Sequence, residues 1–161
     1  MDKVNPNIST YNHQLRTRIC GICIHQDKLL LVRHQYTVQN NAFWAPPGGG
    51  LKYGETIADC LKREFQEETG LQVEPGRFLF LNEFLQPPLH ALEYFFEANL
   101  VDGALTKGSD PEHTSNKQII EQVKFLSLPE VNKIPLQDKH RMLHHLYSFD
   151  DLLGMKNHFI V

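Results

Sequence analysis

The most informative stretch of this 161-residue chain is GGLKYGETIADCLKREFQEETGL, which spans residues 49–71. It opens with glycines, carries neither glycine nor proline from Glu55 to Thr69, and closes on Gly70. Glycine often follows the last turn of a helix, because it adopts left-handed backbone angles without steric cost. The stretch therefore predicts a glycine-rich loop followed by a helix over residues 55–69.

The predicted helix has an apolar side and a polar side. At about 100° per residue, the apolar residues gather on one side, which carries Ile57, Ala58, Leu61 and Phe65. The opposite side carries Asp59, Lys62 and Gln66. Glu64 and Glu68 do not join the polar side, because they fall within about 20° of Ile57, and Glu67 lies on the same edge. We therefore expect three carboxylates at the edge of the buried side, partly turned toward the core.

These carboxylates destabilise the helix unless something offsets their charge. Between Glu55 and Glu68 there are five acids and two bases, a net charge of −3 that equals that of the whole chain. Like charges one turn apart repel each other, and partial burial adds to that cost. A hard cation such as Mg²⁺ takes carboxylate oxygens together with substrate phosphates. The alternative is a solvated acidic face, but that would place the acids opposite the apolar side.

The residues that precede the helix suit a nucleotide. Gly49 and Gly50 let backbone amides approach a phosphate, and a helix N-terminus favours an anion. Tyr36, Phe43 and Trp44 come shortly before the glycines and could stack on a nucleobase, with core packing as the alternative. Gly49, Gly50, Phe43 and Trp44 are therefore our candidate substrate-binding residues.

The spacing of these residues resembles the Nudix box, G-x5-E-x7-R-E-U-x-E-E-x-G-U, in which U is a bulky aliphatic residue. Every fixed position of the box is matched, by Gly49, Glu55, Arg63, Glu64, Glu67, Glu68 and Gly70. Phe65 and Leu71 occupy the two U positions, and the aromatic Phe65 is a mild departure from the pattern. The strand pattern from about residue 15 to residue 147 is also similar to that of the family.

The resemblance implies a fold, a reaction and a set of site residues. The fold is α/β, a Nudix-type α/β/α sandwich with a mixed β-sheet. The reaction is hydrolysis of a pyrophosphate bond in a nucleoside diphosphate linked to another group, with Mg²⁺ or Mn²⁺ as the cofactor. The implied metal ligands are Glu64, Glu67, Glu68 and the Gly48 carbonyl. Arg63 would orient a box glutamate, and Glu55 would be structural.

A further carboxylate is expected from outside the box, because many family members recruit one as a metal ligand or base. Glu121 is our candidate, since it opens a predicted strand at a place where the family often has an acid ahead of an aromatic residue. Glu83 and Glu97, on neighbouring predicted strands, are the alternatives.

The rest of the chain predicts one domain. We expect residues 1–13 to form a flexible N-terminal arm and residues 14–161 a single Nudix hydrolase domain, because roughly 150 residues is a typical domain size. The apolar pattern predicts strands at residues 15–24, 28–34, 71–84, 90–101 and 119–126. A hairpin turn is expected at residues 25–27, and loops are expected at residues 35–50 and 102–117.

A final helix is predicted over residues 137–147. His140, His144 and His145 on this segment have a spacing that suits metal binding on a helix. No H-E-x-x-H motif accompanies them, so we predict that they lie on a polar helix face.

Composition excludes several classes of partner. Sixteen basic residues face nineteen acids, so we expect no membrane surface as a partner and regard nucleic acid as an unlikely one. The first residues contain no apolar run, and we expect neither a secretory signal nor a membrane span. Three cysteines suit a reducing cytoplasm, and Cys20 and Cys23, which face opposite sides of a predicted strand, are expected to pack in the core. A homodimer is also possible, because dimers are common in the family.

The sequence indicates the type of reaction more firmly than the identity of the substrate. Pro87 lies sixteen residues after Leu71 and resembles the downstream proline of ADP-ribose-cleaving family members. We therefore expect a small nucleotide substrate, with ADP-ribose or another nucleotide sugar ahead of a nucleoside triphosphate. A non-catalytic nucleotide sensor is the alternative from another class, but such modules usually have a degraded box.

Overall fold

The computed structural model describes residues 13–36, 41–108, 120–155 and 159–160. Nearly all of the flexible arm predicted for residues 1–13, and part of the loop predicted for residues 102–117, lie outside these ranges. The side chain of Tyr36 is also outside the described part. These predictions therefore stay as predictions.

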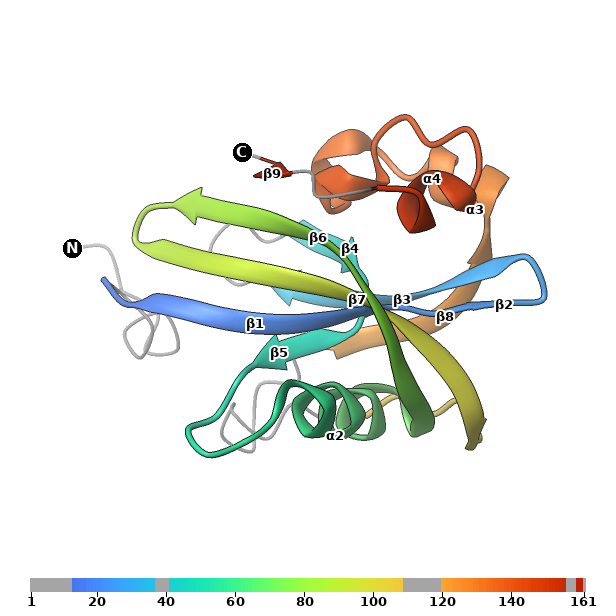
Figure 1. Cartoon of the computed structure of the whole chain (residues 1–161). Helices are drawn as coiled ribbons and strands as arrows, with labels where there is room; N and C mark the ends of the chain where they lie inside the picture. The colour runs from blue at the N-terminus through green and yellow to red at the C-terminus, as the bar shows by residue number, and fades with distance from the viewer. Residues whose placement is uncertain (1–12, 37–40, 109–119, 156–158, 161) are drawn as a thin grey trace.

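Two β-sheets form the middle layer of the fold (Figure 1). The larger sheet has the strand order β5-β1-β7-β6-β9. Its strands are β1 (Leu15–Ile22), β5 (Gly48–Gly50), β6 (Leu71–Gln86), β7 (Leu89–Gly103) and β9 (Phe159–Ile160). Strand β1 runs parallel to β7 and antiparallel to β5. The sheet is therefore mixed, as predicted.

The smaller sheet is built around β3. Its strands are β2 (Ile24–His25), β3 (Lys28–Tyr36), β4 (Asn41–Ala45) and β8 (Ile120–Ser127), and all three partners pair with β3 in the antiparallel sense. The predicted hairpin turn joins β2 to β3 through Gln26 and Asp27, with φ of 49° and 57°. Two successive positive φ values are typical of the two-residue turn that matches the twist of antiparallel strands.

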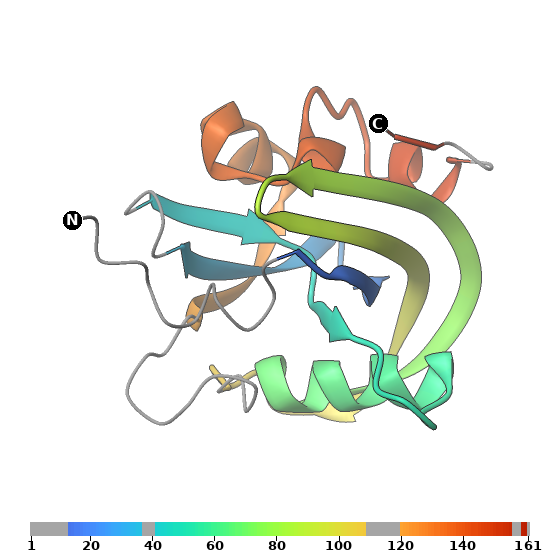
Figure 2. The ribbon, with the colours of Figure 1, turned by 90° about the vertical axis from the view of Figure 1, so that its left-hand side faces the viewer.

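Helices cover both sides of this layer (Figures 1 and 2). Helix α2 (Ile57–Thr69) lies on one side, where Phe65 packs with Ile19 and Leu30. The C-terminal segment lies on the other side, where Leu143 packs with Phe80 and Phe95. This segment contains α3 (Leu128–Lys133), two 3₁₀ turns (Leu136–Asp138 and Arg141–Leu143) and α4 (Asp150–Leu153). The predicted α/β/α sandwich is confirmed.

The cysteines pack in the core as expected. Cys20 belongs to the apolar cluster under the C-terminal segment, whereas Cys23 belongs to the cluster under α2. All three cysteines are free and buried. The two nearest in sequence thus point to opposite sides of the sheet, which excludes a joint redox or metal role for them in this fold.

The loop predicted for residues 35–50 is wrong. It contains β4, which pairs with β3, and β5, which pairs with β1. The glycines of β5 were predicted to be loop residues, but they permit β5 to pair closely with β1. A Cβ atom on Gly48 would collide with the carbonyl oxygen of Ile19 and with Cys20.

The helix predicted over residues 137–147 is also wrong. The segment forms two 3₁₀ turns separated by Lys139 and His140, whose backbone pairs with Trp44. Lys139 donates its side-chain ammonium to the carbonyl of Val131 at 2.9 Å. Contacts to distant parts of the chain therefore replace the regular hydrogen bonds of a helix, and sequence periodicity does not reveal such contacts.

Candidate functional site

Helix α2 is fixed at both ends by its own sequence. Thr56 caps the N-terminus, where its hydroxyl accepts a hydrogen bond from the amide of Asp59 at 3.1 Å. Gly70 ends the helix with a left-handed φ of 71°, as the sequence predicted. The helix begins at Ile57, two residues later than expected, because the capping residue needs an extended backbone.

The buried side of α2 includes two of the three acids. Glu64 is 5% exposed and Glu68 only 2%, whereas Glu67 is partly exposed. The prediction that Glu64 and Glu68 turn toward the core is confirmed. Ile57 and Ala58, which were expected to be buried, are exposed.

Arg63 connects the acids of this helix. Its guanidinium binds both carboxylate oxygens of Glu55, with Nε at 2.6 Å and Nη2 at 2.9 Å. Its Nη1 donates to Glu64 at 2.6 Å and to Glu67 at 3.1 Å. The hydrogen bonds from Arg63 lower the pKa of Glu55 to about 2. Arg63 therefore holds three carboxylates in fixed orientations at neutral pH.

Strand β5 lies directly against these acids. The amide of Gly48 donates to Oε2 of Glu68 at 3.0 Å. A Cβ atom on Gly49 would occupy the position of the Glu64 carboxylate, so only glycine leaves room for that group. The glycines were expected in a loop at the helix N-terminus, and this placement is wrong, whereas the contact of Gly49 and Gly50 with an anionic substrate stays a prediction. The glycines form a strand beside the helix, and the Gly48 amide binds a carboxylate of this chain.

The chemistry of these groups fits a hard divalent cation. Carboxylate oxygens from Glu64, Glu67 and Glu68, together with the carbonyl of Gly48, are the oxygen donors that Mg²⁺ and Mn²⁺ prefer. Within the described ranges, no three His, Cys, Asp or Glu side chains are grouped closely enough to hold an ion by themselves. Nη1 of Arg63 binds one oxygen of Glu64 and one of Glu67, and so fixes the orientation of both carboxylates.

The candidate acids outside the box occupy different places. Glu121 lies on β8, which packs against α2, and its carboxylate is 3.4 Å from the guanidinium of Arg33. Glu97 binds Arg77 at 2.7 Å, and the same arginine contacts the carbonyl of Leu153 on the opposite side of the sheet from α2. Glu83 is hydrogen-bonded to a histidine at 2.8 Å. Glu97 faces away from the box helix, and Glu121 stays our candidate.

The candidate aromatic residues lie beside the C-terminal segment. Trp44 is partly buried and packs against the apolar core, and the ring of Phe43 lies 6.2 Å from that of His140. The prediction that His140 lies on a polar helix face is wrong, because this residue is buried. His144 binds the carbonyl of Leu136 at 2.9 Å.

A second group of polar residues was missed by the sequence analysis. We call it the buried polar cluster, and it consists of Arg18, Asn82, Glu93, His140 and Arg141. Oε2 of Glu93 contacts Nδ2 of Asn82 at 2.7 Å and Nε2 of His140 at 2.8 Å. Nη1 of Arg18 lies 4.0 Å from the other oxygen of Glu93. Nε of Arg141 donates to Asn82 at 2.8 Å.

Glu93 is ionised despite its burial. Burial alone would raise its pKa, but the hydrogen bond with His140 and the charge of Arg18 lower the pKa to about 2. The available sequence signal was a charged residue inside the apolar run Leu92–Phe96. It could have indicated a buried partner, but it could not identify that partner.

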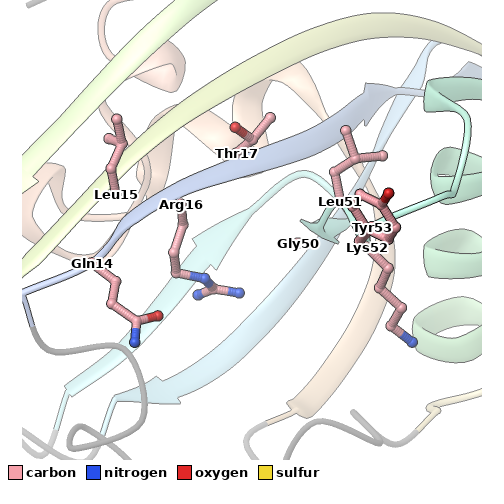
Figure 3. A pocket seen from close by; sticks show the side chains of 8 residues that line it. All are labelled: Gln14, Leu15, Arg16, Thr17, Gly50, Leu51, Lys52 and Tyr53. Carbon is pink, nitrogen blue, oxygen red and sulfur yellow. The ribbon is translucent and has the colours of Figure 1, made fainter.

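A pocket of about 420 Å³ adjoins the glycine strand (Figure 3). It is lined by Gln14, Leu15, Arg16, Thr17, Gly50, Leu51, Lys52 and Tyr53. Two of these residues are basic and none is acidic. The side chains of Arg16 and Lys52 extend from the two sides of the pocket, and Tyr53 is fully exposed. The pocket therefore suits a group with negative charge.

Comparison with known proteins agrees with this arrangement. A family model described as the NUDIX domain matches residues 14–147. A 64-residue segment is 31% identical to the phosphatase NudJ of Escherichia coli K12. That segment covers 40% of this chain and 41% of NudJ, so the match spans about two fifths of the relative.

Solved structures show the same fold. A NUDIX hydrolase from Nitrosomonas europaea matches with a TM-score of 0.64 and 20% identity, over 91% of this chain and 78% of that one. An ADP-ribose pyrophosphatase from Streptococcus suis matches with a TM-score of 0.57 and 20% identity, over 89% and 98% of the two chains. No helix within the described ranges is long and apolar enough to cross a membrane.

Proposed function

We propose that this chain is a metal-dependent pyrophosphohydrolase. The premise is that it belongs to the Nudix family, because the family model matches residues 14–147. The proposed substrate is a nucleoside diphosphate linked to another group, such as ADP-ribose. The observation that supports this function best is the pair of buried carboxylates, Glu64 and Glu68, packed against the glycine strand. A complete box with these contacts favours an enzyme over a non-catalytic sensor.

We propose that Glu64, Glu67, Glu68 and the Gly48 carbonyl hold Mg²⁺ or Mn²⁺. A bound ion of this kind supplies positive charge that offsets the charge on the diphosphate oxygens as water attacks phosphorus. The role of this chain is to orient the donors. Arg63 sets the direction of Glu64 and Glu67 through its Nη1 contacts, and the Gly48 amide sets that of Glu68.

The pocket beside Gly50 is our candidate binding site for the part of the substrate that extends beyond the scissile linkage. Its lining continues directly from the glycine strand, and Arg16 and Lys52 favour a phosphate-bearing or otherwise anionic group there. Phe43 and Trp44 are the proposed contacts for the nucleobase, as their aromatic rings suit stacking.

The test of the function is a hydrolysis assay with a panel of nucleotides. The panel contains ADP-ribose, another nucleotide sugar and nucleoside triphosphates, in Mg²⁺ or Mn²⁺, with phosphate, pyrophosphate and nucleoside monophosphate measured as products. We expect release of a nucleoside monophosphate from a nucleotide sugar. Turnover of triphosphates alone would change the substrate class, and no turnover of any nucleotide with either metal would contradict the proposed activity.

We further propose that Glu121 acts as the additional ligand or base. Glu121→Gln is expected to lower kcat more than it raises KM, because a group that acts in the transition state contributes little to ground-state binding. Glu97→Gln is the matched control, since Glu97 is engaged with Arg77 on the other side of the sheet. A kcat of Glu121→Gln equal to that of the control would remove Glu121 from the site.

A further inference from the structure

Gly48 is held from two directions by charged side chains. Its amide donates to Glu68 on α2 at 3.0 Å, and its carbonyl oxygen accepts from Nη2 of Arg18 at 3.0 Å. Together with the pairing of β5 with β1, in which the amide of Gly21 donates to the carbonyl of Pro47 at 3.0 Å, these two contacts hold the peptide groups on either side of Gly48. The contact with Glu68 comes from the box, whereas the contact with Arg18 comes from the buried polar cluster.

Arg18 in turn faces Glu93, which is 6% exposed, across an ion pair of 4.0 Å. Nδ1 of His140 accepts a hydrogen bond from the amide of Met142 at 3.2 Å. Its Nε2 must therefore carry the proton that it donates to Glu93. One oxygen of Glu93 thus accepts hydrogen bonds from His140 and Asn82, while the other oxygen faces the arginine.

The C-terminal segment also holds the chain just before Gly48. The amide of His140 donates to the carbonyl of Trp44 at 2.8 Å, and Trp44 is separated from Gly48 by three residues. A displacement of His140 therefore acts on the glycine strand by two routes, through Trp44 and through Glu93 with Arg18.

We propose that Arg18, Glu93 and His140 are positioning residues for the reaction. Acting through Arg18, they fix the backbone of Gly48 and, through its amide, the carboxylate of Glu68. This inference rests on the proposed function, since it concerns the orientation of two of its metal donors. Partners that orient metal ligands typically change metal affinity or activity about 10–100-fold when they are altered. A cluster that only stabilises the fold would lower the melting temperature and leave both quantities unchanged.

The test compares Glu93→Gln with Glu97→Gln. Both positions lie on β7, both are glutamates paired with an arginine, and only Glu93 connects to Gly48. Affinity for Mn²⁺ is measured by electron paramagnetic resonance without substrate, and kcat and KM are measured at a temperature at which every variant is folded. We expect Glu93→Gln to lower Mn²⁺ affinity and kcat by about 10–100-fold, with a smaller change in KM. Glu97→Gln is expected to match the wild type.

A double-mutant cycle then tests the pathway through Arg18. Arg18→Lys keeps the charge but cannot contact Gly48 and Glu93 together as the guanidinium does. If the two residues act in series, adding Glu93→Gln to Arg18→Lys changes Mn²⁺ affinity less than the sum of the two single effects. Fully additive effects would contradict a connection through Arg18.

Two further outcomes are decisive. If Glu93→Gln does not fold, Arg18→Lys replaces it, because lysine keeps the positive charge opposite Glu93 and loses only the joint contact with Gly48. Wild-type affinity and kcat in the folded variant, with only a lower melting temperature, would overturn the proposal. Failure of the proposed function is a different result, because the wild type itself would then neither bind Mn²⁺ nor hydrolyse any nucleotide.

Discussion

Two groups of charged residues meet at the glycine strand, and they differ in how their charges are balanced. On the α2 side, Arg63 faces Glu55, Glu64 and Glu67, so acids outnumber the arginine that binds them. In the buried polar cluster, Glu93 faces Arg18 and receives hydrogen bonds from Asn82 and His140. The first group has an excess of negative charge to offer a cation, whereas the second, which holds two arginines and one carboxylate, has none.

The two groups also differ in their contact with water. The side chain of Glu67 is 25% exposed, whereas those of Glu93 and His140 are 8% and 6% exposed. The arginines of the two groups are alike, with Arg63 at 20% and Arg18 at 22%. An exposed excess of charge tolerates the loss of one member, because water replaces the missing partner. Loss of a buried carboxylate such as Glu93 is not tolerated in this way, since its partners Asn82 and His140 are left without water or a hydrogen-bond acceptor. The comparison therefore predicts opposite responses to mutation.

The largest effect is expected for the stability of the buried polar cluster. Glu93→Ala should lower the free energy of unfolding by about 3–5 kcal/mol, because it leaves the Arg18 charge without its buried partner. Glu97→Ala is the matched control, and loss of its exposed pair with Arg77 should cost about 1 kcal/mol or less. Denaturant unfolding followed by circular dichroism measures both. Equal losses in the two variants would show that burial does not distinguish the pairs.

The next largest effect concerns activity on the α2 side. Glu68→Gln should lower kcat by at least about 100-fold, because it removes a proposed metal ligand rather than a partner of one. The variant should stay folded, since glutamine still has an oxygen that accepts from the Gly48 amide. Glu74→Gln is the control, because Glu74 pairs with Lys62 on the exposed side of the same helix. Near-normal turnover of Glu68→Gln at saturating Mg²⁺ would exclude it as a ligand.

Mg²⁺ binding should stabilise the protein through the α2 side, because that group has the excess of acids. Mg²⁺ at a hundred times its Kd should stabilise the wild type by about 2.7 kcal/mol, a rise in melting temperature of roughly 2–4 °C per kcal/mol. Glu67→Gln should show a smaller rise and a higher melting temperature without metal, because it relieves repulsion between acids.

This thermal experiment uses sodium chloride at equal ionic strength as its control. Screening of an ordinary acidic surface would give the same rise with either salt. The melts are repeated with a non-hydrolysable nucleotide, because the nucleotide phosphates contribute ligands to Mg²⁺. The proposed site is wrong if both proteins respond identically to the two salts.

The smallest effect is expected in acid. The pKa of Glu93 lies at about 2, below its ordinary value of 4.5, so its ionised form stabilises the fold. This stabilisation is complete above about pH 4.5 and is lost as the pH falls toward 2, because the unfolded chain takes up the proton first. The unfolding free energy of Glu93→Gln should therefore decrease less over this range than that of the wild type. If the unfolding free energies of the two proteins decreased equally over this pH range, the low pKa of Glu93 would be contradicted.

The sequence predicted the parts of the molecule that local patterns determine. Helix α2 and its end at Gly70 followed from apolar spacing and one glycine, and the long strands β6 and β7 followed from their apolar runs. The burial of Glu64 and Glu68 was predicted because the relevant neighbours lie within one helix. These features depend on residues that are close in the sequence.

The parts that were wrong or missed depend on distant partners. The glycines of β5 read as a loop because their pairing with β1 involves residues about thirty positions away. His140 was expected on a polar helix face, but its partner Glu93 lies 47 residues earlier. A single sequence contains no local signal for such pairs, so the buried polar cluster could be found only from the fold.

The β6–β7 hairpin has a consequence for protein engineering. Strand β6 starts directly after Gly70, at the end of the box helix, and it carries Asn82, whereas β7 returns with Glu93. One continuous hairpin thus joins the two polar groups (Figure 1). A design that transplants only residues 48–71 into another scaffold would move the acids without the groups that hold Gly48 in place. The smallest transferable unit includes β1, this hairpin and the segment around His140.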